Sequence, residues 1–343
     1  MTIRLTKLIA LLPADTEQRV EKTRTRADHR IRDVLRRETG LQLNRDLKQA
    51  ASRTDPVSVP IDIKPGLPAE LEDLEFDDEY WLSVTIAPYR RKLELAREGL
   101  TGSLELIPKL LASSDGKRLL AGRQQASSES IGLISELLAF VAARDPLTRI
   151  LSINTDVLGC YRYSVAREQN LPLFGDAVLA RDPFDGRIEL YWGVIGLVAT
   201  TLNADVEALT TVVLAHELAH AYTHMGADID GERWATFAFS KTDKAVVEGL
   251  AQYYTHLVCE RLEETIPGTM FAYLEMCPRQ PPIYRTHLPW IKDYLPEIVR
   301  SALLETRRNR KLALQDFEDS LAAERKRLRK KDYRSSSDGE SRK

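Results

Sequence analysis

Cysteine is scarce in this chain, and its three copies form no recognisable pair. Cys160, Cys259 and Cys277 are odd in number, lie far apart and make no C-x-x-C motif. This pattern excludes a disulfide-stapled scaffold and a four-thiolate metal site, because both need paired or clustered cysteines. We therefore expect a protein of a reducing compartment and predict a cytoplasmic location.

Long hydrophobic runs are also lacking. The sequence contains no stretch of about 18 uncharged apolar residues, the minimum for a membrane-spanning helix. The N-terminal apolar run Leu8–Leu12 is too short for the hydrophobic region of a secretory signal. We expect no membrane partner.

An excess of one charge is missing as well. The chain has 49 Lys and Arg against 51 Asp and Glu, which gives a formal net charge of -2. This balance excludes a polycation that coats nucleic acid, so nucleic acid is not an expected partner of the whole molecule. The sequence specifies no oligomeric state.

The chain is long enough for about two average domains. Alternating charges over 15–47 predict a solvated helix or helix pair, and four prolines within 56–68 predict an extended linker. We divide the sequence into a charged helical N-terminal region (1–55), a mixed, mainly helical region (56–148), a candidate catalytic domain (149–305) and a basic helical tail that ends in disorder (306–343).

The third of these regions carries the clearest secondary-structure patterns. Alternating apolar residues indicate strands, and apolar residues at helical spacing indicate two helices. The predicted elements are strands over 157–163 and 187–192 and helices over 205–226 and 240–264. We expect Asp205 and Ser240 to cap the two helices at their N-termini, and Gly226 to end the first.

The first predicted helix contains the motif His216-Glu217-Leu218-Ala219-His220, an H-E-x-x-H sequence. On a helix, the two imidazoles lie one turn apart on one face and can bind the same Zn²⁺ ion. Glu217 is rotated about 100° from His216, so its carboxylate can reach a water molecule at the metal and act as a general base. The motif therefore predicts a catalytic zinc site.

A catalytic zinc ion needs a third protein ligand, and Glu248 is our first choice. It is the only ionised residue in the apolar stretch 245–251, where an unpaired buried carboxylate would cost several kcal/mol. The adjacent Gly249 indicates a close approach to another element, which we expect to be the histidine helix. Gln252, one turn later, is a candidate to hydrogen-bond a ligand.

Alternatives to this third ligand remain open at this stage. Glu248 could pair with a Lys or Arg in the core, and Asp228 or Asp230, just beyond the histidine helix, could complete the site instead. His224 lies two turns beyond His216 and is poorly placed to close a tetrahedron, so we expect it to support the site or lie at the surface.

Hydrolysis of a carbonyl compound also needs a hydrogen-bond donor for the oxyanion that forms. We predict His287, in the segment IYRTHLPW, for this catalytic role. The further candidates are four tyrosines, Tyr222, Tyr253, Tyr254 and Tyr284.

Two stretches, VLAHELAH (213–220) and VVEGLAQYY (246–254), resemble the signature of the gluzincin group of zinc metallopeptidases. That group has H-E-x-x-H on one helix and a glutamate ligand on a later one, and the resemblance covers about residues 150–300. It implies that His216, His220 and Glu248 bind one Zn²⁺ ion and that Glu217 is the general base.

The resemblance also implies a fold and a mode of substrate binding. We expect an α+β, zincin-like domain with a small mixed sheet, an active-site helix and a helical lower half, preceded by a mainly helical N-terminal region. The strand over 187–192 would be the edge strand that holds an extended substrate by β-augmentation.

We therefore predict a zinc metallopeptidase that hydrolyses peptide bonds in a peptide or protein substrate. The alternative is a catalytically inactive protein of the same fold that binds or regulates a partner. In that case its basic C-terminal segment would contact nucleic acid or an acidic protein. An intact Glu217 favours the enzyme.

Overall fold

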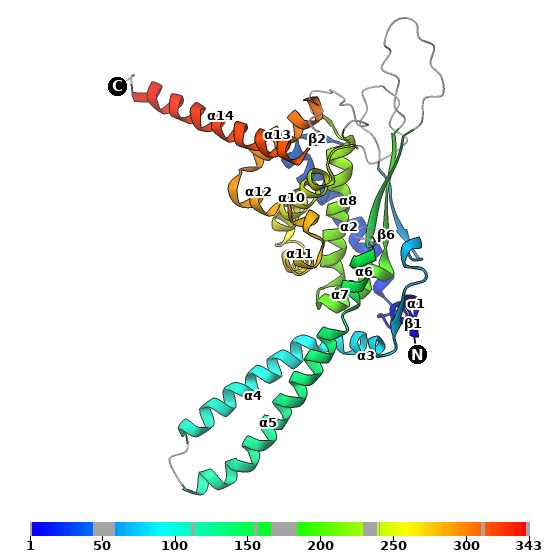
Figure 1. Cartoon of the computed structure of the whole chain (residues 1–343), viewed down its shortest axis with the longest axis vertical. Helices are drawn as coiled ribbons and strands as arrows, with labels where there is room; N and C mark the ends of the chain where they lie inside the picture. Colours follow the sequence, from blue (N-terminus) through cyan, green and yellow to red (C-terminus); the bar gives the residue numbers. More distant parts are fainter. Residues whose placement is uncertain are drawn as a thin grey trace, which may run out of the picture.

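The computed structural model describes most of the chain, and helices predominate in it (Figure 1). The described residues are 2–43, 59–110, 114–153, 157–165, 184–228, 239, 241–309 and 313–340. A small mixed sheet accompanies the helices, so the predicted α+β class is confirmed.

The described elements follow the chain from β1 to α14. The helices are α1 (Leu5–Ile9), α2 (Thr16–Thr39), α3 (Glu79–Ile86), α4 (Arg90–Leu110), α5 (Ser114–Ala143), α6 (Pro146–Ile153), α7 (Trp192–Leu202), α8 (Val206–Met225), α10 (Lys244–Leu262), α11 (Thr269–Met276), α12 (Leu288–Asp293), α13 (Pro296–Asn309) and α14 (Leu314–Glu340). The strands are β1 (Thr2–Arg4), β2 (Leu41–Gln42), β3 (Ile61–Lys64), β4 (Glu75–Asp77), β5 (Gly159–Val165), β6 (Phe184–Tyr191) and β7 (Ala227–Asp228).

The main sheet has the order β3-β6-β5, with β6 parallel to β3 and antiparallel to β5. Both predicted strands are present, but the expectation that the strand over 187–192 forms an edge is wrong, because β6 is central and β3 and β5 are the edges. The strand β3 comes from the segment predicted as a linker. Pro60 and Pro65 flank it and leave the four residues between them free to pair.

The faces of the sheet differ in polarity because side chains alternate along each strand. On β6, Ile188 and Leu190 are fully buried on the side of α8. On the opposite face, Glu189 accepts a hydrogen bond from Arg162 Nε at 2.6 Å and pairs with Lys64 Nζ at 3.4 Å. One face of the sheet therefore belongs to the core and the other carries an ion-pair network.

Helix α8 lies at the centre of the molecule, between the sheet and a layer of helices (Figure 1). Its bounds confirm the predicted helix, with Asp205 at the N-cap and Gly226 after its last residue. Neighbours on several sides explain why nearly all its residues are buried: α2, α7, α10, α11 and the sheet all contact it. The predicted metal-binding motif thus belongs to the most enclosed helix.

The N-terminal helix α2 packs against α8, although the sequence predicts a solvated helix there. Val20 and Ile31 are fully buried. The charges on the packed face are accommodated as a buried pair, in which Arg32 Nε donates to Asp28 at 2.5 Å. Because these paired charges lie on the buried face, the charge pattern of the sequence predicts an exposed helix.

Helix α10 packs on α8 and begins later than predicted. Its N-cap is Asp243, whose side chain accepts a hydrogen bond from the Ala245 backbone N–H at 2.9 Å. Ser240, the predicted cap, lies outside the described residues. Asp243 lies three residues after Ser240. The later start does not change which residues share a face of the helix, because the helical period determines this.

Helices α4 and α5 form a hairpin that projects from the body (Figure 1). The run Arg123–Ile153, which continues into α6, is the one helix among the described residues that could cross a membrane by length and composition alone. Its apolar part contains Glu129 and Glu136, which is why no uncharged stretch of this length is found in the sequence.

The C-terminal helix α14 also leads away from the body (Figure 1). Its first turns are anchored by Phe317 and Leu321, both fully buried, and the Phe317 ring lies 4.8 Å from that of Trp290. The helix continues to Glu340, whereas the sequence predicts disorder over the last dozen residues. The run of helix-forming Arg and Lys residues before this point favours the continuation.

Candidate metal centre

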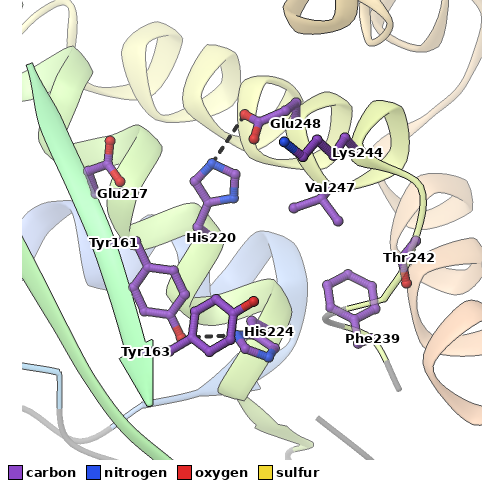
Figure 2. A pocket seen from close by; sticks show the side chains of 10 residues that line it. All are labelled: Tyr161, Tyr163, Glu217, His220, His224, Phe239, Thr242, Lys244, Val247 and Glu248. Atoms are coloured by element: carbon purple, nitrogen blue, oxygen red, sulfur yellow. Dashed lines mark hydrogen bonds and ion pairs between the residues drawn. The ribbon is translucent and has the colours of Figure 1, made fainter. Parts of the chain in front are cut away.

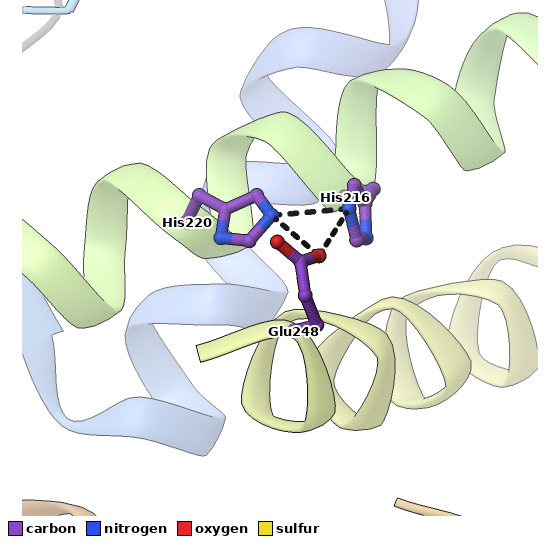
Figure 3. Close-up of side chains that lie close together, drawn as sticks. All are labelled: His216, His220 and Glu248. Atoms are coloured by element: carbon purple, nitrogen blue, oxygen red, sulfur yellow. Dashed lines mark hydrogen bonds and ion pairs between the residues drawn. The ribbon is translucent and has the colours of Figure 1, made fainter. Parts of the chain in front are cut away.

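Three side chains converge between α8 and α10 (Figure 3). His216 and His220 lie one turn apart on α8, and their Nε2 atoms are 3.1 Å apart. Glu248 reaches them from α10, with Oε2 at 3.5 Å from His216 Nε2 and 3.3 Å from His220 Nε2. The structure therefore brings together the three residues that the sequence predicts as ligands.

The spacing of these atoms suits a single metal ion. Donor atoms at about 2.0–2.2 Å from a tetrahedral zinc ion lie about 3.3–3.6 Å from one another. The three observed separations of 3.1, 3.3 and 3.5 Å are close to this range. Two imidazoles and one carboxylate are also the donor set of many catalytic zinc sites. The residues present fit a zinc ion.

The surroundings of Glu248 favour its ionised form. Burial opposes ionisation, but the imidazoles of His220 and His216 outweigh it and hold the pKa of Glu248 well below its usual range. Its Oε2 atom is buried and makes no hydrogen bond with any described residue. A buried carboxylate oxygen that faces two imidazoles and has no other donor is arranged as a ligand.

Glu217 lies where β5 passes over α8, and it lines the same pocket as His220 and Glu248 (Figure 2). The close approach depends on Gly159, because a Cβ atom there would lie 3.0 Å from Glu217 Cγ and 2.8 Å from Val213 Cγ1. Glu217 is 4% exposed, so its carboxylate is shielded from bulk solvent while still lining a pocket.

The pocket has a volume of about 200 Å³ and opens beside the ligands (Figure 2). It is bounded by β5, α8 and the N-terminal turn of α10. Its lining residues are Tyr161, Tyr163, Glu217, His220, His224, Phe239, Thr242, Lys244, Val247 and Glu248.

The structure does not describe the side chains of the two alternative third ligands. Asp230 and the side chain of Asp228 lie outside the described part of the chain. Core pairing of Glu248 with a Lys or Arg is not found among the described residues, where its ion-pair partners are the two histidines. Glu248 is therefore the ligand supported by the described geometry.

Two residues near Glu248 have other neighbours than expected. Gly249 approaches Trp290, because a Cβ atom on it would lie 2.6 Å from Trp290 Cη2, so the expected approach to the histidine helix is wrong. The reason is geometric, since one residue along a helix is a rotation of about 100°. Gln252 Nε2 donates to Gln280 Oε1 at 3.0 Å.

His287, predicted to stabilise an oxyanion, lies outside the pocket. It is fully buried, and its Nε2 atom is 2.5 Å from the Tyr273 hydroxyl. Burial, with the nearby His256 imidazole, lowers its pKa to about 4. The ring of Tyr284 lies 5.8 Å from that of His216. The pocket side of the site thus contains neither His287 nor its hydrogen-bond partner.

Aromatic residues of the pocket are the part that sequence reasoning missed. Tyr161 and Tyr163 point from β5 toward His224, and Tyr161 Oη lies 3.1 Å from His224 Nδ1 (Figure 2). His224 is 5% exposed and belongs to the pocket, which agrees with a supporting role. The alternation of Tyr161 and Tyr163 signals a shared face, but it does not say which element that face meets.

The assignment of the metal centre rests on this geometry, because comparisons with known proteins give no match. No family model, no curated protein and no solved structure matches the chain.

Proposed function

We propose that this protein is a zinc-dependent peptidase. The observation that carries the proposal is the convergence of His216, His220 and Glu248 at a pocket that Glu217 also lines, under an edge strand. The ligand set would hold the ion, the adjacent carboxylate would move a proton, and the strand would hold the substrate. Two of the ligands and Glu217 come from α8, the third ligand comes from α10, and the strand is β5.

The Nε2 atoms of the two histidines and Oε2 of Glu248 would bind the ion. A zinc ion held there supplies Lewis-acid activation of a water molecule and of the scissile carbonyl. The two helices that carry the ligands pack directly on each other, so the donor atoms stay in place without a contribution from a loop.

Glu217 would act as general base and then as general acid. Its carboxylate accepts a proton from the attacking water and passes it to the nitrogen of the departing amine. Burial between α8 and β5 restricts its side chain to the pocket side, and Gly159 leaves the space that this position needs. No other carboxylate of the described residues lines the pocket except the ligand Glu248.

The substrate backbone would pair with β5, in place of the strand expected from the resemblance. One side of β5 is paired with β6, and no other described strand pairs with its second side. An unpaired strand edge offers N–H and C=O groups to an extended peptide. This edge runs past the metal ligands, so a bound peptide would cross the site.

The proposal is tested by comparing wild type with Glu217→Gln. We expect both proteins to contain one zinc ion by elemental analysis after purification without added metal. Hydrolysis of fluorescently labelled casein and of a peptide library should fall at least about 100-fold in the variant, since general acid–base catalysis contributes about 10²–10⁴. Equal hydrolysis by the two proteins would contradict the mechanism. Zinc without hydrolysis in either would favour the non-catalytic alternative.

A further inference from the structure

One end of the pocket is built from aromatic rings. The rings of Tyr161 and Tyr163 are 5.7 Å apart, and that of Tyr163 lies edge-on to His224 at 4.5 Å. Phe239 continues the group, with its ring 6.3 Å from that of His224. Aromatic rings at these separations attract further rings in stacked or edge-to-face arrangements. The group therefore offers ring faces and edges to a bound side chain.

The exposure of these rings differs in a way that suits a ligand. Phe239 and His224 are 3% and 5% exposed and form the fixed wall. Tyr163 is 44% exposed although it is a large ring on a strand over the core. A partly open ring beside buried ones is typical of a surface that a ligand completes.

The remaining lining sets limits on that ligand. Val247 adds an apolar wall, while Lys244 lies exposed at the first turn of α10, on the same pocket. A Lys or Arg side chain entering here would meet the Lys244 ammonium, so basic side chains are disfavoured. A volume of about 200 Å³ is enough for one large side chain and not for a domain surface.

The direction of β5 decides which side of the scissile bond this pocket serves. Gly159 lies by Val213 and Glu217, whereas Tyr163 lies by His224, so β5 and α8 run in the same direction. A peptide that pairs antiparallel with β5, the slightly more stable arrangement, runs the opposite way. Its N-terminal part then lies over the aromatic rings.

We propose that these residues form a subsite for an aromatic side chain, carried by the residue on the N-terminal side of the bond to be cleaved. The inference rests on the proposed peptidase function and names its substrate class. Tyr161, Tyr163, His224 and Phe239 form the walls, Val247 closes the apolar side and Lys244 selects against basic residues.

The test measures binding separately from turnover. Zinc-loaded Glu217→Gln is titrated by calorimetry with acetyl-Ala-Ala-X-Ala-Ala-amide peptides in which X is Phe, Ala or Lys. We expect the Phe peptide to bind at least about tenfold more tightly than the Ala peptide, and the Lys peptide to bind no better than the Ala peptide. Equal affinity for the Phe and Ala peptides would overturn the inference.

Two substitutions assign this preference to the pocket. Tyr163→Ala removes an open ring and should lower the Phe-to-Ala affinity ratio about fivefold or more. Val247→Phe fills the apolar side and should lower the same ratio. Tyr89→Ala, which truncates a tyrosine that is 56% exposed and remote from the pocket, is the matched control and should leave the ratio unchanged. An unchanged ratio in both pocket variants would contradict the assignment.

Cleavage by wild type then separates the two proposals. Mass spectrometry of the products should locate the cut directly after Phe. A cut before Phe would overturn the direction of binding and with it the inference. Selective binding by Glu217→Gln that depends on Tyr163, without hydrolysis by wild type, would reject the peptidase and keep the aromatic subsite.

Discussion

Helices α8 and α5 are both rich in apolar residues, yet their surroundings differ completely. Every residue of α8 except Glu207 is buried, because other elements contact it on several sides. Among the side chains described in α5, only Val141 is buried, since the helix contacts α4 along its length and α3 at its base. Apolar content alone therefore does not determine burial.

The difference in burial means that α8 is held rigidly by its neighbours, whereas α5 belongs to a hairpin that projects from the body. The proposed metal ligands lie on α8 and α10, which pack directly on each other and so hold the donor atoms in place. The α4–α5 hairpin carries none of the lining residues of the pocket. We expect changes in α8 and α10 to alter metal binding and to destabilise the protein, and matched changes in α5 to leave metal binding unchanged and cause no such destabilisation.

The largest expected effect comes from Glu248→Ala. Loss of a ligand should remove nearly all zinc from the purified protein. The affinity for zinc should fall by at least roughly 100-fold, the loss that follows when a residue that only hydrogen-bonds a ligand is changed. Elemental analysis measures the zinc content. Glu260→Ala, an exposed carboxylate on the same helix, is the control and should keep its zinc. Full zinc in Glu248→Ala would transfer the third-ligand role to Asp228 or Asp230.

A pair of leucine truncations tests the comparison of α8 with α5 directly. Leu214→Ala in α8 removes a fully buried side chain and should lower the free energy of unfolding by about 2–5 kcal/mol. Leu133→Ala in α5 removes a side chain that is 68% exposed, so the change should stay within about 0.5 kcal/mol. Urea unfolding followed by circular dichroism gives both values. Similar losses would show that α5 is covered in solution.

The buried His287 predicts a pH dependence of stability. Its pKa falls from 6.5 to about 4 on folding, because burial favours the neutral ring. Between these pH values the unfolded chain binds a proton that the folded chain does not. Stability should therefore fall as the pH drops from 6.5 toward 4, by up to about 3 kcal/mol, with no contribution above 6.5.

Urea midpoints measured across this range test the assignment to His287. His287→Gln should flatten the dependence, whatever its effect at neutral pH. His29→Gln changes a histidine whose side chain is 70% exposed and should leave the slope as in wild type. An unchanged slope in His287→Gln would assign the dependence to other groups, with His256 first among them because burial lowers its pKa too.

The smallest expected changes in stability come from substituting two helical glycines, and they have opposite signs. Gly249→Ala in α10 places a Cβ atom 2.6 Å from Trp290 and should destabilise the protein by about 1–3 kcal/mol. Gly132→Ala in α5 meets nothing within 4 Å and should stabilise it by about 0.5–1 kcal/mol through helix propensity. Thermal unfolding resolves effects of opposite sign. Stabilisation by both substitutions would contradict the close packing of α10 on α12.

Local patterns predict much of the site. The H-E-x-x-H spacing places His216 and His220 on one face of a helix, and the apolar stretch around Glu248 predicts that its carboxylate has a partner, which proves to be the two histidines. Both predictions depend only on the period of a helix and on the cost of burying a charge. The helix bounds at Asp205 and Gly226 agree with the prediction, although the Asp205 side chain makes no capping hydrogen bond.

Other features depend on contacts between distant segments. The position of β6 in the sheet changes from edge to centre once β3 pairs with it, and β3 comes from more than 100 residues earlier. The neighbour of Gly249 is Trp290, and the burial of α2 depends on its docking against α8. No local pattern specifies such pairs.

By itself, the sequence determined the helices and strands of the site and the four residues that carry its proposed chemistry, because local periodicity and residue type suffice for these. Only the tertiary structure decided that β6 is central and β5 an edge strand, and that Tyr161, Tyr163, His224 and Phe239 meet in one pocket. These residues come from three separate segments, and their contacts form only when the whole chain has packed.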